Sequence, residues 1–198
     1  MFALWMFGRI LEQVWGSRRF FIYYMVTGLG AVTIHLLVNY LHIHAIQTDA
    51  AAMLNTPSPD VFAAFVTRHF PEYYDQVYSQ FLDKWYLFPN NPIYTEQAAE
   101  YTRQLISLQQ GIPTVGASGA VYGVLLAFGV LFPNTILMLL FPPIPIKAKW
   151  MVIIYGGLEL YLGLTQPGSS IAHFAHLGGM IFGFFLIKLW QRRTDVFY

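Results

Sequence analysis

The sequence predicts an all-α protein that crosses a membrane several times, and two observations support this fold class. Hydrophobic residues make up 56% of the 198 residues and charged residues 11%, whereas a typical soluble domain is roughly 25% charged. The few charges are also segregated, because long stretches of the chain contain none. This composition excludes a disordered chain and a nucleic-acid-binding protein that relies on a basic surface.

Four stretches are apolar enough to be interpreted as membrane-spanning helices. They cover residues 20–42, 115–132, 150–164 and 171–190. Residues 1–8 are apolar but too short to span, so we expect a partial helix there, followed by a loop over Arg9–Arg19. The start is not typical of a signal peptide, since it lacks a basic region and a small-residue cleavage site. A buried core helix is the alternative for any one run, but four runs with so little charge favour a membrane.

The basic residues predict how the helices are oriented. Alternating spans place eight of the eleven Lys and Arg residues on one side: Arg9, Arg18, Arg19, Lys147, Lys149, Lys188, Arg192 and Arg193. Seven of the ten acidic residues fall in the segment 45–113, on the other side. Because Lys and Arg concentrate on the cytoplasmic side, we expect a multi-pass protein of a bacterial inner (plasma) membrane with a cytoplasmic C-terminus.

The segment 45–113 is expected to be a long helical insertion on the external side. Ser58 followed by Pro59 is typical of a helix start, and Thr95 with Glu96 predicts a second helix that Gly111 ends. Aromatic residues are dense between them: Tyr73, Tyr74, Tyr78, Phe81, Trp85, Tyr86 and Phe88. They favour a cap at the membrane–water interface, and a small soluble subdomain with its own core is the alternative. We treat residues 1–198 as a single membrane domain.

Two polar residues inside the apolar spans are the candidates for chemistry, because polar groups are costly in lipid. Ser118 lies near the outer end of the span 115–132, and His176 lies near the outer end of the span 171–190. Both spans run from outside to inside, so the two side chains are expected at a similar depth. An imidazole can remove a serine proton near neutral pH and thereby create a nucleophile. The pair therefore predicts a serine–histidine dyad.

Small residues around this pair favour close approach of the two helices. Two glycine pairs have a four-residue spacing, which lets backbones approach in lipid: Gly119 with Gly123, and Gly179 with Gly183. Gly116 leaves the chain free to turn before the serine, so that backbone N–H groups can point at a developing oxyanion. Each motif alone is ordinary, since small residues are common in membrane helices and a lone intramembrane histidine is usually structural.

At these residues the sequence resembles the rhomboid intramembrane serine proteases. The motifs that carry the resemblance are Glu12-x-x-x-Gly16-Ser17, Gly116-Ala117-Ser118-Gly119 and Ala175-His176-x-x-Gly179-x-x-x-Gly183. The resemblance implies a Ser118–His176 dyad that cleaves transmembrane protein substrates near the external face, without a cofactor or a metal. It also implies that Tyr122 packs on the base, and that the backbone N–H groups of Ala117 and Ser118 contribute to the oxyanion hole.

The sequence departs from the family pattern at its start. Rhomboids have a first helix and, in the second, a His-x-x-x-Asn pair that donates to the oxyanion, and this sequence begins beyond that pair. We therefore expect a rhomboid-like bundle that lacks the first helix and most of the second, as if Met1 were an internal methionine; a genuine short form is the alternative. His35 and Asn39 repeat the spacing in a later helix, where interhelical polar contacts are expected for them.

Two further polar residues are left with open roles. His173 is either a second base or an interfacial histidine, and Glu159 either makes a structural hydrogen bond or snorkels to the membrane surface. The function predicted is an intramembrane serine endopeptidase whose partners are transmembrane substrates and the lipid bilayer. The alternative is a catalytically impaired rhomboid-like protein that binds membrane helices. A transporter or channel is disfavoured, because it would need more ionisable groups inside the membrane than Glu159 alone.

Overall fold

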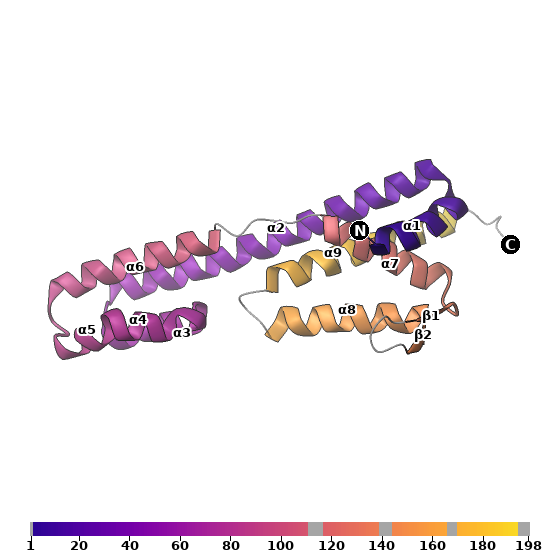
Figure 1. The fold of residues 1–198 in the computed structure, drawn as a ribbon. Coiled ribbons are helices and arrows are strands. Elements are labelled where there is room, and N and C mark those ends of the chain that lie inside the picture. The colour runs from indigo at the N-terminus through magenta and orange to yellow at the C-terminus, as the bar shows by residue number, and fades with distance from the viewer. Residues whose placement is uncertain (1, 111–116, 139–143, 166–169, 194–198) are drawn as a thin grey trace. The chain divides into compact units, whose positions relative to one another are not determined.

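The computed structural model describes residues 2–110, 117–138, 144–165 and 170–193, and almost all of them are helical (Figure 1). The predicted class, an all-α helical bundle, is thereby confirmed. The elements in order are α1 (Phe2–Trp15), α2 (Ser17–Asn55), α3 (Pro59–His69), a 3-10 turn (Pro71–Tyr73), α4 (Tyr74–Val77), a π-helical turn (Tyr78–Leu82), α5 (Asp83–Leu87), α6 (Pro92–Gln110), α7 (Ala117–Leu131), β1 (Ile136–Met138), β2 (Pro145–Lys147), α8 (Ala148–Thr165) and α9 (Ser170–Arg193).

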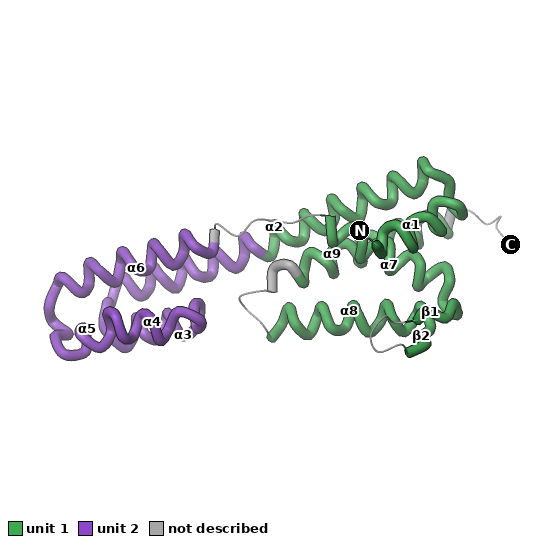
Figure 2. The backbone as a smooth tube through the Cα atoms, in the orientation of Figure 1, with its two compact units in different colours: residues 1–38, 114–198 green, residues 39–113 purple. Residues whose placement is uncertain are grey.

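The chain divides into two compact units, which Figure 2 shows in different colours. The first, called the bundle unit, consists of residues 1–38 and 114–198. The second, called the insertion unit, consists of residues 39–113. Helix α2 contributes its first part to one unit and its second part to the other. Each unit is described by itself below.

The bundle unit is built around α7. This helix contacts α1, α8 and α9, and α8 also contacts α9. Its core includes Leu11, Tyr23 and Val124, none of which is exposed. The two short strands form an antiparallel pair in which Leu137 lies opposite Ile146, and this pair leads directly into α8.

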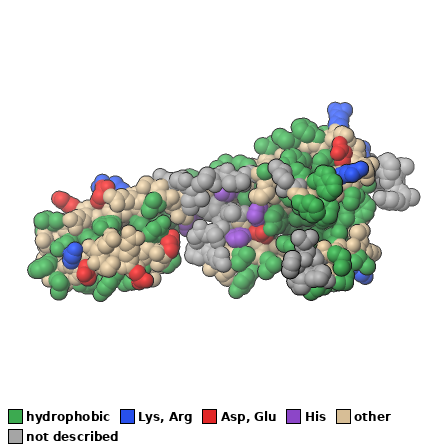
Figure 3. Space-filling model, viewed as in Figure 1, with side chains coloured by type: hydrophobic (Ala, Val, Ile, Leu, Met, Phe, Trp, Pro, Cys, Tyr) green, Lys and Arg blue, Asp and Glu red, His purple; other side chains and the backbone are tan. Residues whose placement is uncertain are grey.

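Large apolar side chains also cover the outside of the bundle unit (Figure 3). Leu164 on α8 is 70% exposed, and Phe185 on α9 and Leu29 on α2 are exposed to a similar degree. Helix α2 and residues 173–191 of α9 are long and apolar enough to cross a membrane, and α7 is apolar but shorter. Exposed apolar surface on this scale is typical of contact with lipid or with another protein.

The insertion unit has a hydrophobic core of its own. Phe62, Phe81 and Trp85 are almost fully buried and their rings contact one another, with centroids 5.4–6.0 Å apart. Residues of α2 and α6, among them Met53 and Leu105, complete this core. Of the aromatic residues that favoured an interfacial cap, Phe81 and Trp85 are therefore packed inside the unit, whereas Tyr78, Tyr86 and Phe88 stay exposed. The core that these two rings help to form is what the alternative of a subdomain requires.

The N-terminal helix is longer than predicted, and the expected loop over Arg9–Arg19 is wrong. Helix α1 continues to Trp15, and the chain turns at Gly16 before α2 begins at Ser17. Gly16 has a φ of 78°, a left-handed conformation that glycine adopts without steric cost. Its N–H donates to the carbonyl of Glu12 over 2.8 Å, which ends α1 in the usual way.

Three helix limits in the insertion unit also bear on the predictions. Helix α2 does not stop near His42 but continues to Asn55, because no proline interrupts it before Pro57. Helix α3 begins as predicted, with the Ser58 hydroxyl accepting the N–H of Val61. Helix α6 begins at Pro92 rather than Thr95, since the side chain of Asn91 accepts the N–H of Ile93 over 3.1 Å. Gly111, its expected end, lies outside the described residues.

Candidate active site

Ser118 and His176 meet where α7 packs on α9. Ser118 is the second residue of α7, and His176 lies one to two turns into α9. Nε2 of His176 is 3.0 Å from Oγ of Ser118, a hydrogen-bonding distance between a nucleophile and a base. Both residues are partly exposed, so small reactants have access to them. Gly116, the first residue of the predicted motif, lies outside the described residues.

Glycines allow the two helix backbones to touch beside this pair. A Cβ on Gly179 would collide with the backbone carbonyl of Gly119, and a Cβ on Gly119 would lie 3.0 Å from the carbonyl oxygen of Ala175. Gly123 and Gly183, the later glycine of each predicted pair, lie against helix α2. Gly123 and Gly183 face Tyr23 and Thr27 of α2, and the Tyr23 hydroxyl donates to the carbonyl of Gly123 over 2.8 Å. Gly119 and Gly179 thus bring α7 and α9 together, Gly119 also lies against Ala31 of α2, and Gly123 and Gly183 make room for side chains of α2.

Tyr122 lies flat against the imidazole of His176. The two ring centroids are 4.1 Å apart and the ring planes differ by 9°. Tyr122 is one helical turn beyond Ser118 on α7, which explains how the same helix contacts His176 through both side chains. The stack restricts rotation of the imidazole and leaves its two nitrogens free to make contacts at the ring edge.

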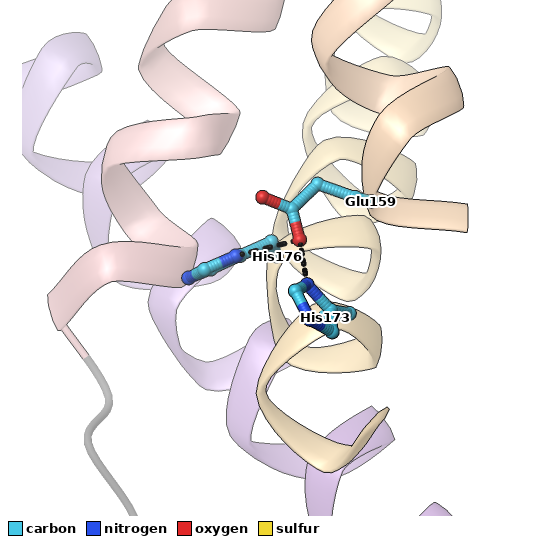
Figure 4. A group of neighbouring side chains, drawn as sticks. All are labelled: Glu159, His173 and His176. Carbon is cyan, nitrogen blue, oxygen red and sulfur yellow. Dashed lines mark hydrogen bonds and ion pairs between the residues drawn. The ribbon is translucent and has the colours of Figure 1, made fainter. Parts of the chain in front are cut away.

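Glu159 of α8 is the residue that the sequence left without a role, and it lies at the centre of this group (Figure 4). The Tyr122 hydroxyl donates to its Oε1. Nδ1 of His173 is 2.6 Å from its Oε2, and Nδ1 of His176 is 3.1 Å from the same oxygen. The second contact has ion-pair distance but not hydrogen-bond direction, because Nδ1 of His176 makes no hydrogen bond within the described residues.

The Glu159 carboxylate is removed from solvent, with a side chain only 10% exposed. A buried carboxylate is destabilising unless donors or a positive charge compensate it. Here one hydroxyl and two imidazoles surround it, and either imidazole becomes a compensating charge when it is protonated. The Tyr122 hydroxyl and the two imidazole nitrogens are thus the polar groups that face the buried carboxylate.

The same three side chains could hold a metal ion, since donor atoms of Glu159, His173 and His176 lie within 4.8 Å of one another. Ligand atoms around a tetrahedral zinc stand about 3.3 Å apart or more, given bonds of about 2.0–2.1 Å. The 2.6 Å contact between Glu159 and His173 is shorter and fits a shared proton. Hydrogen bonding explains this arrangement without a metal.

The sequence motifs indicated Ser118, His176 and Tyr122 but not the contacts of Glu159 with Tyr122 and the two histidines. His173 contacts Glu159, whereas it is His176 that contacts Ser118. The available signal was the single acid between residues 151 and 187, together with two histidines three apart in the next span.

The other histidine–asparagine spacing that the sequence analysis noted lies in α2. His35 is buried there, and Oδ1 of Asn39 is buried with no hydrogen-bond partner among the described residues.

Comparison with known proteins agrees with the sequence motifs. The family model for the rhomboid domain matches residues 1–50 and 94–193, and so leaves out the middle of the insertion unit. Rhomboid protein 1, mitochondrial, of Saccharomyces cerevisiae is 32% identical over 87 residues, which are 42% of this chain and 25% of that protein. The chain thus matches about a quarter of the length of this curated relative. No solved structure matches.

The predicted resemblance and the predicted rhomboid-like helical fold are both confirmed by these matches. The family model covers most of the chain, including the segments that carry Ser118, Glu159 and His176. The apolar helices and the family together indicate an integral membrane protein. The chain therefore belongs to the rhomboid family.

Proposed function

We propose that this protein is an intramembrane serine endopeptidase that cleaves transmembrane protein substrates with Ser118 and His176. The observation that carries the proposal is the 3.0 Å separation between Nε2 of His176 and Oγ of Ser118, with Tyr122 stacked on the imidazole. Membership of the rhomboid family supports a protease-like function more broadly. A serine or a histidine alone in a membrane helix would not be enough to support this proposal.

The proposed reaction needs only this pair, the substrate and water. Oγ of Ser118 attacks the carbonyl carbon of the scissile bond while its proton moves to Nε2 of His176. The C–N bond then breaks as that proton passes to the leaving nitrogen, which leaves an acyl-serine. Water attacks the acyl carbon, gives a proton to Nε2, and the C–O bond to Ser118 breaks as the serine regains its proton.

The oxyanion would be held by backbone donors at the start of α7. Ala117 and Ser118 are the first two residues of that helix, and the first four N–H groups of a helix have no partner within it. These groups are also the positive end of the helix dipole. Donors of this kind are worth about 100- to 1000-fold in rate when one is removed.

The orientation in the membrane is part of the proposal. The basic residues near Arg18, Lys149 and Lys188 would face the cytoplasm of a bacterial plasma membrane, and the insertion unit would face outward. The sequence contains no cysteine, so single-cysteine variants report on sidedness cleanly. In intact cells a membrane-impermeant maleimide should label Glu96→Cys and spare Lys149→Cys. The reverse pattern would contradict the orientation.

Labelling by a fluorophosphonate tests the chemistry directly. We expect the probe to modify the protein at Ser118, and Ser118→Ala to lose labelling down to background. Ser107→Ala, which removes an exposed hydroxyl on α6, is the matched control and should label as the parent does. Labelling that persists in Ser118→Ala would exclude this serine as the nucleophile. A folded protein that is never labelled would favour the alternative function, binding of membrane helices without cleavage.

A further inference from the structure

We propose that Glu159 is a positioning residue for the base, so that the site works as a serine–histidine–glutamate group rather than as a pair. This inference rests on the proposed function and adds a third residue to it. Glu159 lies on α8, whereas Ser118 lies on α7 and His176 on α9. Every polar contact described for its carboxylate comes from Tyr122, His173 or His176.

The carboxylate lies on the side of the imidazole where a positioning group is needed. Nε2 of His176 contacts Ser118, and Nδ1, the other ring nitrogen, is 3.1 Å from Oε2 of Glu159. Nε2 can accept the serine proton only if the ring hydrogen is on Nδ1. A carboxylate beside Nδ1 stabilises that tautomer, in the way that the third residue of a serine triad does.

Charge strengthens this role during the reaction. When the serine proton reaches Nε2, His176 becomes a cation while Glu159 remains ionised. The two opposite charges then stand side by side in a site that largely excludes water, where their attraction is stronger than in solvent. In the resting arrangement Oε2 is bound more closely by His173, so the contact to His176 has room to shorten as the charge develops.

Tyr122 holds the base and the carboxylate in one arrangement. Its ring stacks on His176, and its hydroxyl donates to Oε1 of Glu159. The imidazole is therefore restrained on its face by Tyr122 and on one edge by the hydrogen bond to Ser118, while its other edge faces the Glu159 carboxylate. If the carboxylate served only to join α8 to α9, the contact to His173 would be enough. The contacts to Tyr122 and His176 would then have no purpose.

The test is the kinetics of fluorophosphonate modification of the full chain, with kinact and KI measured separately. Oγ of Ser118 bonds to phosphorus, fluoride leaves, and the proton goes to His176. Glu159→Gln keeps the size of the side chain and removes the charge. We expect its kinact to fall about 100-fold or more while KI changes little, because the loss is in activation of the nucleophile. Glu96→Gln, at an exposed carboxylate of the insertion unit, should change neither constant.

Two further variants separate positioning from a structural link. His173→Gln breaks the shorter contact of Glu159 but leaves the carboxylate beside His176, so we expect it to lose less than about tenfold in kinact. Glu159→Asp keeps the charge and withdraws it by about 1.5 Å, so its kinact should lie between those of the parent and Glu159→Gln. If Glu159→Gln does not fold, Glu159→Asp alone decides, through a lowered kinact at unchanged KI.

The outcomes distinguish this inference from the function on which it rests. Parent-like kinact in Glu159→Gln, or in Glu159→Asp if that variant alone folds, with labelling still dependent on Ser118, would overturn the positioning role and leave the protease proposal intact. Equal losses in His173→Gln and Glu159→Gln would also overturn it, in favour of a structural pair. If the parent is not labelled at Ser118, both proposals fall together.

Discussion

The contact between α7 and α9 and the core of the insertion unit are packed by opposite means. Where α7 meets α9, glycines let backbone touch backbone, as between Gly119 and Gly179. In the insertion unit, large rings such as Phe62 and Trp85 fill the interior. Helices in lipid gain little by burying apolar side chains against each other, so close packing of small residues replaces it. A core that forms in water is stabilised by the burial of large apolar groups.

This difference has a consequence for where changes in size are tolerated. Beside Ser118 and His176 a single added methyl group meets a backbone atom that cannot move by itself. In the insertion unit the sensitive change is the loss of volume. Substitutions that remove volume in one region and add it in the other should therefore have opposite kinds of effect.

Removal of the central ring of the insertion unit should have the largest effect. Trp85 is fully buried against Phe62 and Phe81. Trp85→Ala should cost about 3–5 kcal/mol of stability, seen as rapid proteolysis within residues 39–113, while Ser118 is still labelled by a fluorophosphonate. Trp85→Phe should cost less, because it keeps a ring and removes an Nε1–H that has no hydrogen-bond partner among the described residues. Loss of labelling in Trp85→Ala would mean that the two units do not fold independently.

An added methyl group at the helix contact should have the next largest effect. The Cβ of Gly179→Ala would meet the carbonyl of Gly119, next to Ser118. A shift of about 1 Å at a catalytic group costs about 100-fold in rate, and we expect a loss of that size in the labelling rate. Gly157→Ala is the matched control, since nothing lies within 4 Å of that position. Its labelling rate should equal that of the parent, and parent-like labelling of Gly179→Ala would refute the close packing.

Removal of the Tyr122 hydroxyl should have an intermediate effect. Tyr122→Phe retains the stack on His176 and loses the hydrogen bond to Glu159. A hydrogen bond to a charged group contributes about 1.5–3 kcal/mol, so the labelling rate should fall at least about tenfold. Tyr122→Leu loses the stack as well and should be slower still. Equal rates in the two variants would show that the stack contributes nothing beyond the hydroxyl.

The smallest effect is expected at the surface of the insertion unit, where the Tyr86 hydroxyl donates to Asp60 over 2.9 Å. Desolvation, and then the hydrogen bond and charge of Asp60, raise the pKa of Tyr86 to about 12. Because this pKa exceeds the ordinary value of about 10, the neutral phenol stabilises the fold below pH 10, and this contribution is lost as pH rises through 12. The exposed contact is worth less than about 1 kcal/mol.

Asp60→Ala should therefore shift the ionisation of Tyr86 to lower pH. The measurement is a difference titration of tyrosine absorbance, in which Tyr86→Phe in each background isolates this one phenol among the 13 tyrosines. The same titration curve with and without the Asp60 carboxylate would show that desolvation alone raises the pKa.

Much of the candidate site was predictable from local sequence because it depends on residue type and spacing. Ser118 and His176 stood out as polar residues in apolar spans at a matched depth. Glycines spaced four residues apart in the same two spans indicated that the two helices approach closely. The start of α3 was equally predictable, since the N-cap of Ser58 and the fixed φ of Pro59 determine the helix start within one turn. The all-α membrane class followed from the composition and the apolar spans, and the rhomboid-like fold was implied by the resemblance of these motifs to that family.

Tertiary structure decided the rest, because it depends on residues that are far apart in the chain. Glu159 had no role until α7, α8 and α9 brought Tyr122, His173 and His176 around it. The aromatic density around Trp85 and Phe81 favoured an interface, with a core as the alternative, and packing against α2 and α6 placed them in a core. Local preference sets which residues can act, but the contacts between helices decide which of them meet.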